Sequence, residues 1–314
     1  MRKRSDSRPV DGILLLDKPA GLSSNTALQR IKRLYRAERA GHTGTLDPLA
    51  TGLLPICMGE ATKFGGSLLE SDKAYIATVK LGERTDTGDA AGTVLERREV
   101  AVDQAALEAA LKRFRGTLEQ VPPMYSALKQ EGRPLYELAR QGKTVERKPR
   151  TVQLHRVELV SFNSPFFTMD VACSKGTYIR TLAEDVGSAL GCGAHITALR
   201  RTAAGVFQID QCLTLDALEE VSEVERDGFL LPLDLLVRSW PRTELSEAAA
   251  MRFRHGEAVH LPERGSGNDA CKTAVYERSG GFLGLGNLDG SGVLKPHRLL
   301  KQDSNPEPGL SQKP

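Results

Sequence analysis

The chain has 314 residues, of which 40% are apolar and 26% are charged, and its formal net charge is only +3. This is the composition of an ordinary soluble globular protein. A chain of this length can form two domains with a large core that needs no disulfide or metal staples. The small net charge excludes a uniformly basic nucleic-acid-binding protein, so a polyanion site must come from a local concentration of bases.

The first part of the chain is predicted to contain a tail, a strand and a helix. Residues 1–9 are basic and are expected to form a disordered tail. The apolar run at 12–16 predicts a short buried strand. Ser23 or Ser24 can cap a helix that extends to about Tyr35.

The next segment, residues 41–59, contains six glycines and prolines, so we expect a shaped loop with at most brief regular pieces. Beyond it, strands and helices interleave at uneven spacing without a sustained βαβ repeat, which predicts an α+β fold with a mixed or antiparallel sheet. The expected elements are a strand at 75–81, a helix capped by Asp103, a helix at 135–141, strands at 152–160 and 166–173, and a helix from Thr177 through Leu190.

The chain changes character after Pro241. A helix is expected at 245–253, followed by short apolar runs separated by many glycines, which is typical of a small β-rich domain. Residues 303–314 are expected to be disordered. We therefore predict a main domain at 10–240 and a β-rich domain at 241–302.

Basic side chains are concentrated in two segments, residues 29–39 and 129–150, whereas acidic residues gather elsewhere, as at 216–227. This segregation fits a protein with one face that binds a polyanion. The alternative is a set of solvated helix faces.

The five cysteines are scattered and include no C-x-x-C pair, which indicates free thiols in a reducing compartment. Cys192 and His195 have a C-x-x-H spacing, but no second pair lies nearby, so a zinc site is not expected. No apolar run has the length of a signal peptide or a membrane span, and we expect a cytoplasmic protein.

Asp47 is the first candidate for chemistry, because it lies in a glycine-rich loop directly before Pro48. The proline disfavours the α conformation at Asp47, so a stiffened turn presents the carboxylate. Functional residues favour loops held by a rigid scaffold. The alternative is an aspartate that only hydrogen-bonds its own turn.

Arg180 is the second candidate. If Thr177 caps the following helix, Arg180 lies in its first turn, where a cation opposes the helix dipole and suggests a compensating anion. Its guanidinium would keep a buried carboxylate ionised and oriented, which makes Asp47 a candidate partner. A surface pair with Glu184 is the alternative.

Two tyrosines accompany these segments. Tyr75 and Tyr178 could offer aromatic faces to a base extruded from an RNA fold, although ordinary packing explains each equally well. His42 could contact RNA or brace the loop. Residues 85–89 lack the full oxygen pattern of a calcium loop, so we interpret them as a turn.

Five ordered blocks of sequence carry a resemblance to a known family. The segment GHTGTLDPLATGLLPICMGEATK resembles the catalytic motif of the TruB-type tRNA pseudouridine-55 synthases of bacteria. Further matching blocks are DKPAGLSSN, KAYIATVKLGERTDTGDAAG, PPMYSALKQEGRPLYELARQG and CSKGTYIRTLAEDVG. The C-terminal part resembles the family only loosely.

The resemblance implies a pseudouridine-synthase core, a mixed sheet flanked by helices, with a small C-terminal PUA-like RNA-binding domain. The implied reaction isomerises uridine 55 in the T loop of tRNA to pseudouridine, on a flipped-out nucleotide. It needs no guide RNA, cofactor, metal or membrane, and the enzyme is expected to be a monomer.

The resemblance also implies residue roles. Asp47 would be the nucleophile, acting on the sugar or on the base, with Arg180 holding it ionised. Tyr75 would stack on the flipped base and help to remove the C5 proton. Tyr178, Leu199 and His42 would line the nucleotide pocket, and Lys18 would be a backbone or structural contact near the cleft. Arg30, Lys32, Arg33, Arg147, Lys148 and Arg150 would contact tRNA phosphates.

Two other functions are compatible with parts of the sequence. A non-catalytic tRNA-binding or folding chaperone on the same scaffold would explain the basic segments without needing Asp47. A hydrolase would use Asp47 as a base or metal ligand, but the chain offers no convincing second ligand set.

Overall fold

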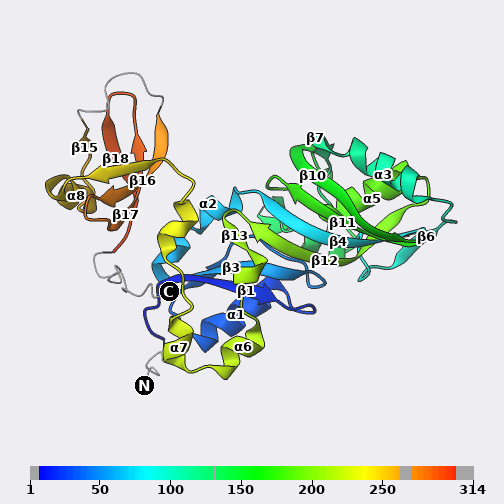
Figure 1. Cartoon of the computed structure of the whole chain (residues 1–314), viewed down its shortest axis with the longest axis horizontal. Coiled ribbons are helices and arrows are strands. Elements are labelled where there is room, and N and C mark those ends of the chain that lie inside the picture. The colour runs from blue at the N-terminus through cyan, green and yellow to red at the C-terminus, as the bar shows by residue number, and fades with distance from the viewer. Residues whose placement is uncertain (1–6, 131, 262–269, 302–314) are drawn as a thin grey trace.

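The computed structural model describes residues 7–130, 132–261 and 270–301. The described residues form a large mixed sheet with nine strands and a five-stranded sheet near the C-terminus (Figure 1). Helices cover the large sheet, so the expected α+β fold and the β-rich C-terminal part are both confirmed. In the described ranges no helix is long and apolar enough to cross a membrane.

The large sheet has the order β1-β3-β12-β4-β11-β10-β7, and β2 and β13 pair with β3 and β12. Its pairs are antiparallel except β3 with β12. The bounds are β1 Gly12–Lys18, β2 Ala40–His42, β3 Thr51–Met58, β4 Lys73–Leu81, β7 Gly116–Gln120, β10 Arg150–Asn163, β11 Phe166–Cys173, β12 Ala194–Ala204 and β13 Phe207–Gln208. Two small hairpins are β5 Glu83–Thr85 with β6 Val94–Arg97, and β8 Lys129–Gln130 with β9 Arg133–Pro134.

Eight α-helices and three 3₁₀ turns occur among the described residues. They are α1 Ser24–Leu34, α2 Gly65–Leu69, α3 Gln104–Arg113, α4 Leu135–Arg140, α5 Ile179–Ala189, α6 Leu215–Glu220, α7 Glu223–Asp227, α8 Glu247–Arg254, η1 Gly59–Lys63, η2 Ile209–Gln211 and η3 Leu233–Val237. Apolar side chains of α1, α3, α5 and α6 join a single core cluster on one face of the sheet.

Strand β1 is buried on both faces, which explains its unbroken apolar sequence. Leu14 and Leu16 face the cluster under the helices, whereas Ile13 and Leu15 face a second cluster. Side chains alternate between the faces of a strand, so each apolar residue of this run packs into one of the two clusters. The expectation of a buried strand here is confirmed.

The prediction of a loop over residues 41–59 is wrong for its second half, because β3 occupies Thr51–Met58. The glycines and prolines of this segment favour a loop, but pairing with three neighbouring strands, β1, β2 and β12, outweighs that local preference. Pro55 cannot donate a hydrogen bond, yet it fits opposite Leu15, and its carbonyl accepts the Thr43 N–H at 3.1 Å.

Caps set the starts of the helices. Ser23 caps α1 by accepting the Thr26 N–H at 3.0 Å, and Asp103 caps α3 as expected. The expected cap at Thr177 is wrong by one residue, because α5 begins at Ile179 and its N-cap is Tyr178.

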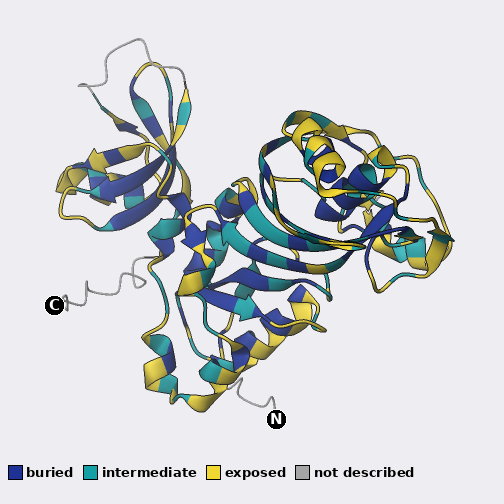
Figure 2. Cartoon of the chain, turned by 45° about the vertical axis from the view of Figure 1, so that its right-hand side comes forward, coloured by how far each residue is buried: buried dark blue, intermediate teal, exposed yellow. Residues whose placement is uncertain are grey.

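A second core cluster joins the large sheet to the five-stranded sheet, whose order is β14-β16-β17-β18-β15. Phe64 and Phe282 meet edge to face at 5.4 Å across this junction, and both side chains are buried. Figure 2 shows buried residues along the strands of both sheets. The strands are β14 Arg242–Leu245, β15 Val259–His260, β16 Cys271–Glu277, β17 Phe282–Leu288 and β18 Val293–Leu299. The helix expected at 245–253 is α8, displaced toward the C-terminus because β14 precedes it.

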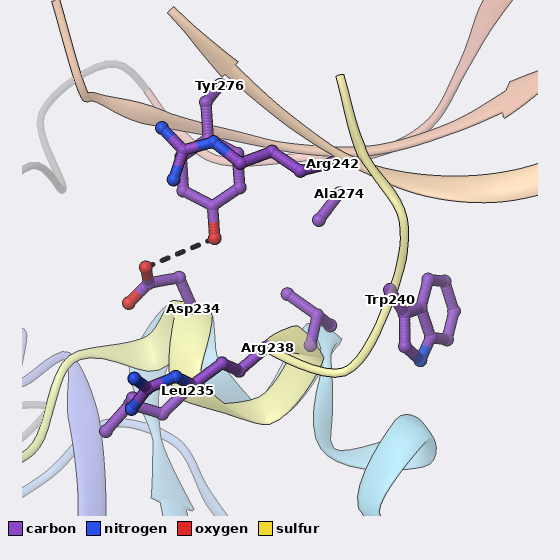
Figure 3. A pocket seen from close by; sticks show the side chains of 8 residues that line it. Asp234, Leu235, Arg238, Trp240, Arg242, Ala274 and Tyr276 are labelled. Atoms are coloured by element: carbon purple, nitrogen blue, oxygen red, sulfur yellow. Dashed lines mark hydrogen bonds between the residues drawn. The ribbon is translucent and has the colours of Figure 1, made fainter. Parts of the chain in front are cut away.

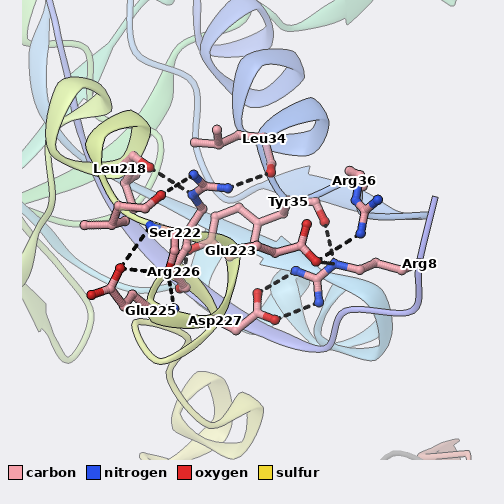
Figure 4. Close-up of polar contacts among 11 residues, drawn as sticks. Arg8, Leu34, Tyr35, Arg36, Leu218, Ser222, Glu223, Glu225, Arg226 and Asp227 are labelled. Carbon is pink, nitrogen blue, oxygen red and sulfur yellow. Dashed lines mark hydrogen bonds and ion pairs between the residues drawn. The ribbon is translucent and has the colours of Figure 1, made fainter. Parts of the chain in front are cut away.

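The prediction of a disordered tail at residues 1–9 is wrong for Arg8, whereas residues 1–6 lie outside the described residues, as do 303–314. The Arg8 guanidinium donates two hydrogen bonds to the Asp227 carboxylate, at 2.7 and 2.6 Å (Figure 4). Nearby, the Tyr35 hydroxyl donates to the Arg226 carbonyl at 2.8 Å, and Arg226 donates to the Leu34 carbonyl at 3.0 Å. These bonds fix the C-terminal end of α1.

Candidate active site

The loop between β2 and β3 presents Asp47, and its backbone is held from two sides. On one side, the Ser24 hydroxyl accepts the Leu46 N–H at 2.7 Å and donates to the Leu46 carbonyl at 2.9 Å. The Gly21 N–H binds the Pro48 carbonyl at 2.8 Å. Ser24 at the start of α1 and Gly21 just before the helix therefore hold both neighbours of Asp47.

On the other side, Arg201 of β12 lies beneath the loop with only 1% of its surface exposed. Its guanidinium donates to the Leu53 carbonyl at 2.7 Å and to the Gly44 carbonyl at 3.2 Å. Gly52 lies so close that an added Cβ would be 2.3 Å from the Arg201 carbonyl oxygen. Its φ of +100° favours glycine as well.

The structure brings Asp47 and Arg180 together. Arg180 Nε lies 3.0 Å from Asp47 Oδ2, and Arg180 Nη2 lies 3.4 Å from Oδ1. The Arg180 side chain is 6% exposed, whereas that of Asp47 is 35% exposed. The carboxylate is thus oriented by a buried guanidinium and remains open to a substrate. The alternative pairing of Arg180 with Glu184 is absent from the ion pairs of the described residues.

Three further groups fix the direction of the Arg180 side chain. It donates to the carbonyls of Thr87 at 2.8 Å and Tyr125 at 2.6 Å, and Asp89 Oδ2 lies 4.0 Å from its Nε. Asp89 Oδ1 also accepts the Thr87 hydroxyl at 2.7 Å. The turn at 85–89 therefore serves as a support for Arg180.

Burial raises the pKa of the Asp47 carboxyl above its ordinary value. The Arg180 guanidinium opposes this rise, and the negative charge of Asp89 adds to it. Lys18 is a second cation near Asp47, and burial lowers its pKa to about 8. The Lys18 amine is fully buried and donates to the Pro19 and Leu22 carbonyls at 2.9 and 2.7 Å.

Tyr75 lies on β4 opposite Arg201 of β12. Burial raises the pKa of its hydroxyl, the Arg201 guanidinium opposes this rise, and the Asp47 charge is close enough to add to it. Leu199 is buried on β12 opposite Ala77, two residues from Tyr75 along β4. The Tyr75 hydroxyl is therefore within electrostatic range of the carboxylate, and Leu199 lies two residues farther along the same pair of strands.

Tyr178 is held by a residue that the sequence did not single out. Gln120, which is 2% exposed, accepts the Tyr178 N–H at 2.9 Å and donates to the Tyr178 carbonyl at 3.2 Å. Burial raises the pKa of the Tyr178 hydroxyl, while Ser126, Arg150 and Arg180 lower it. The ring thus lies within the same electrostatic neighbourhood as Asp47.

His42 ends β2 just before the loop. Its Nδ1 is buried and has no hydrogen-bond partner among the described residues. Burial lowers the pKa of the imidazole, and the Arg201 guanidinium lowers it further. The ring is therefore favoured in its neutral form.

The candidate phosphate contacts lie in two places. Arg30, Lys32 and Arg33 are on α1, and Arg30 and Arg33 are exposed and make no ion pair within the described ranges. Lys148 and Arg150 are exposed near the start of β10. Arg147 is half-buried and donates to the Pro122 carbonyl at 3.3 Å.

Four supporting residues were missed by sequence reasoning: Ser24 as a loop brace, Asp89, Gln120 and Arg201. Each acts on a residue distant in sequence, so no local pattern marks it. The one available hint for Ser24 was its place inside the DKPAGLSSN block.

A pocket of about 230 Å³ lies elsewhere, where η3 meets the small sheet (Figure 3). The Arg242 guanidinium lies 4.0 Å from the centre of the Tyr276 ring, and the Tyr276 hydroxyl donates to Asp234 at 3.2 Å. None of the predicted site residues lines this pocket.

His195, considered above for zinc, lies with Nδ1 3.1 Å from the Glu83 carbonyl oxygen.

Comparison with known protein families gives three matches in chain order. Residues 32–179 match the TruB family pseudouridylate synthase (N terminal domain). Residues 180–238 match the tRNA pseudouridylate synthase B C-terminal domain, and residues 241–300 match Pseudouridine synthase II TruB, C-terminal.

Curated relatives are similar over almost the entire chain. A tRNA pseudouridine synthase B of Burkholderia mallei is 55% identical over 302 residues, which cover 95% of this chain and 97% of the relative. A tRNA pseudouridine synthase B of Chromohalobacter salexigens is 53% identical over 305 residues, with 97% and 99% covered.

Among solved structures, a chain of a Cbf5-Nop10-Gar1 complex aligns with a TM-score of 0.71 at 24% identity and covers 95% of this chain and 92% of that one. A chain of an H/ACA RNP bound to a substrate RNA containing 2′-deoxyuridine aligns with a TM-score of 0.70 at 22% identity, covering 97% and 94%. At this level of identity the likeness supports the fold alone.

Proposed function

Because this chain belongs to the TruB family of pseudouridine synthases and is an isomerase that forms pseudouridine in tRNA, we propose that it modifies uridine 55 of the T loop with Asp47 as its nucleophile. The observation that carries the proposal is the Asp47–Arg180 pair. It leaves a carboxylate that is oriented, partly desolvated and still one-third exposed.

The reaction moves the uracil without changing its oxidation state. The bond from ribose C1′ to N1 breaks, the base rotates, and a new bond forms from C1′ to C5. A proton leaves C5 and one is taken up at N1, so atoms balance within the nucleotide. A carboxylate nucleophile can divide such a reaction into two easier steps.

Asp47 would attack either the sugar carbon or the base, and Arg180 would hold its carboxylate in the attacking orientation. Two parallel N–H···O contacts fix both the position and the plane of a carboxylate. The contacts at 3.0 and 3.4 Å support this role. Arg180 also keeps the rise of the Asp47 pKa smaller than burial alone would make it.

The remaining residues would receive a flipped-out uridine. Tyr75 would stack on the base and assist removal of the C5 proton, because its hydroxyl lies near both Arg201 and Asp47. The nucleotide pocket would be lined by Tyr178, Leu199 and His42. Lys18 would be a buried cation near Asp47, where its charge lowers the pKa of the Asp47 carboxyl.

The T arm of tRNA would be held through its phosphates by Arg30, Lys32, Arg33, Arg147, Lys148 and Arg150. Arg150 supports this location, because its charge acts on Tyr178 within the site. The β-rich part at 241–302 would be a PUA-like RNA-binding domain beside a catalytic domain at 10–240.

The enzyme would act as a cytoplasmic monomer without a guide RNA. One structural neighbour comes from an H/ACA RNP, whereas the curated relatives at 53–55% identity are tRNA pseudouridine synthases. The closer similarity in sequence therefore favours direct recognition of tRNA. No cofactor or metal is required by an isomerisation of this kind.

The test is incubation of the full chain with unmodified tRNA, followed by mapping of pseudouridine. We expect one new pseudouridine at position 55, formed by the native chain and abolished in Asp47→Asn, which should still bind tRNA. Modification at another position, or full activity of Asp47→Asn, would refute the proposal. A folding chaperone would retain its function after Asp47→Asn.

A further inference from the structure

Ser24 occupies an unusual place on α1. The helix turns Ala27, Leu28 and Ile31 into the core, and Ser24 lies on the same buried side with 2% exposure. An apolar residue would be the default at such a position. Burying a hydroxyl is unfavourable unless it is hydrogen-bonded, so this one needs a partner.

The partner is the backbone of the residue directly before Asp47. One Ser24 oxygen accepts the Leu46 N–H at 2.7 Å and donates to the Leu46 carbonyl at 2.9 Å. The Leu46 side chain is itself buried, with 3% exposure. Backbone and side chain of Leu46 are therefore both anchored, which leaves Asp47 little freedom to move.

The anchor is rigid because α1 is held at its other end as well. The Tyr35 hydroxyl binds the Arg226 carbonyl, and Arg226 binds the Leu34 carbonyl, as Figure 4 shows. The loop cannot shift away from Arg180 without either breaking the Ser24 contacts or displacing a packed helix.

We propose that Ser24 is a positioning residue of the pseudouridine synthase reaction, which holds the Asp47 carboxylate in line with Arg180 through the backbone of Leu46. The inference rests on the proposed role of Asp47 as nucleophile. Ser24 touches neither substrate nor reacting atoms. Its effect is on the rate of the chemical step and leaves the binding of tRNA unchanged.

Ser23 provides a matched control on the adjacent position. Its hydroxyl caps α1 through the Thr26 N–H at 3.0 Å and makes no hydrogen bond to the Asp47 loop among the described residues. Ser24→Ala and Ser23→Ala each remove one hydroxyl from the same helix end. The two variants therefore separate loss of helix stability from loss of loop position.

The experiment measures single-turnover pseudouridine formation with enzyme in excess, the Kd for unmodified tRNA, and the melting temperature. We expect Ser24→Ala to slow the reaction about 10- to 100-fold, because a displacement of about 1 Å can lower a rate by about 10². Its Kd should change less than about twofold. Ser23→Ala should react within about twofold of the native rate, although it loses a cap that stabilises helices by about 1 kcal/mol.

Equal rates for Ser24→Ala and Ser23→Ala would overturn the inference, as would a rate loss that merely follows the fall in melting temperature. Ser24→Thr keeps the hydroxyl and should recover part of the rate. If Ser24→Ala fails to melt cooperatively, Ser24→Cys, which replaces the hydroxyl by a slightly larger thiol that hydrogen-bonds only weakly, takes its place under the same criteria. Asp47→Asn in the same assay separates the two proposals, because its full activity would refute the nucleophile whatever Ser24 does.

Discussion

Arg180 Nε lies 3.0 Å from Asp47 Oδ2, and yet the pKa of the Asp47 carboxyl is raised, because burial disfavours the anion more than the guanidinium favours it. Asp89 adds to this rise with a second negative charge close by. A base or nucleophile with a raised pKa is more reactive when ionised, and the raised value brings its titration closer to neutral pH.

The pH dependence of the reaction should report this carboxyl. Only the ionised form can act, so the single-turnover rate should fall as the pH drops through a value above 3.8, the ordinary pKa of an aspartate. The measurement is the rate with enzyme in excess between about pH 4 and pH 8, accompanied by a fluorescence check for unfolding. A rate that stays level down to the ordinary value would contradict the raised pKa.

Replacing Arg180 should separate charge from geometry. Arg180→Lys keeps a cation but loses the planar guanidinium that binds Asp47 and the Thr87 and Tyr125 carbonyls. We therefore expect the rate to fall about 10²-fold or more. The acid limb, which is the pH range where the rate falls as Asp47 becomes protonated, should change little. Arg180→Met removes the charge that lowers the pKa of Asp47, so its acid limb should move to higher pH. Arg156→Lys, in the Arg156–Asp170 pair at 2.8 Å on β10 and β11, is the control and should leave both unchanged.

Two buried lysines allow a paired test of stability against pH. Burial lowers the pKa of Lys18 and of Lys73 from 10.5 to about 8. Between those values the unfolded chain binds more protons than the folded one, so the free energy of unfolding should rise with pH. Lys18→Met and Lys73→Met should each remove part of this rise with pH, as measured by chemical denaturation at several pH values. Only Lys18 acts on Asp47, so only Lys18→Met should also move the acid limb, toward higher pH. An equal effect of both variants on the rate would contradict this assignment.

The sequence allowed Asp47 to be singled out as the proposed nucleophile because the cause is local. Pro48 restricts the backbone of Asp47, and the resemblance motif surrounds it. The cap at Ser23 was equally accessible, since helix N-caps are set by adjacent residues. Strand β3 was missed for the opposite reason. Its glycine and proline residues argue for a loop, and only pairing with β1, β2 and β12 makes it a strand.

The residues that support Asp47 and Tyr178 from distant parts of the sequence could not be predicted in the same way. Arg201 binds the Gly44 carbonyl across 157 positions of sequence, and Gln120 binds Tyr178 across 58. Such contacts depend on the register of the large sheet, and a one-residue slip would turn each of these side chains to the other face. Roles that depend on register become visible only once the strands are paired.

The exposed bases of α1 predict a salt-dependent affinity for tRNA. Arg30→Glu with Arg33→Glu should weaken binding and lower the slope of log Kd against log salt by about 0.7–0.9 per lost phosphate contact. Arg97→Glu with Arg98→Glu is the control, because it changes the net charge equally at two exposed arginines that pair with Glu83 and Glu96. Equal losses in both double variants would indicate an effect of net charge alone. The measurement is a titration of unmodified tRNA at several salt concentrations.

Gly52 gives the sharpest test of how the loop that carries Asp47 is packed. An alanine there would bring its Cβ within 2.3 Å of the Arg201 carbonyl oxygen and would force a side chain onto a φ of +100°. The obstacle is backbone of the central sheet, which cannot rotate away. We expect Gly52→Ala to lower the free energy of unfolding by at least about 2 kcal/mol.

Gly41→Ala is the matched control on the neighbouring strand β2, where nothing lies within 4 Å of an added Cβ. It should change stability by less than about 0.5 kcal/mol. At roughly 2–4 °C per kcal/mol, the two variants should differ by at least about 3 °C in melting temperature. Gly52→Ala should also slow the reaction more than it weakens tRNA binding, because Arg201 binds Gly44 in the Asp47 loop as well as Leu53 on β3. Equal melting temperatures would mean that β3 and β12 are farther apart at this point than the close approach of Gly52 to Arg201 requires.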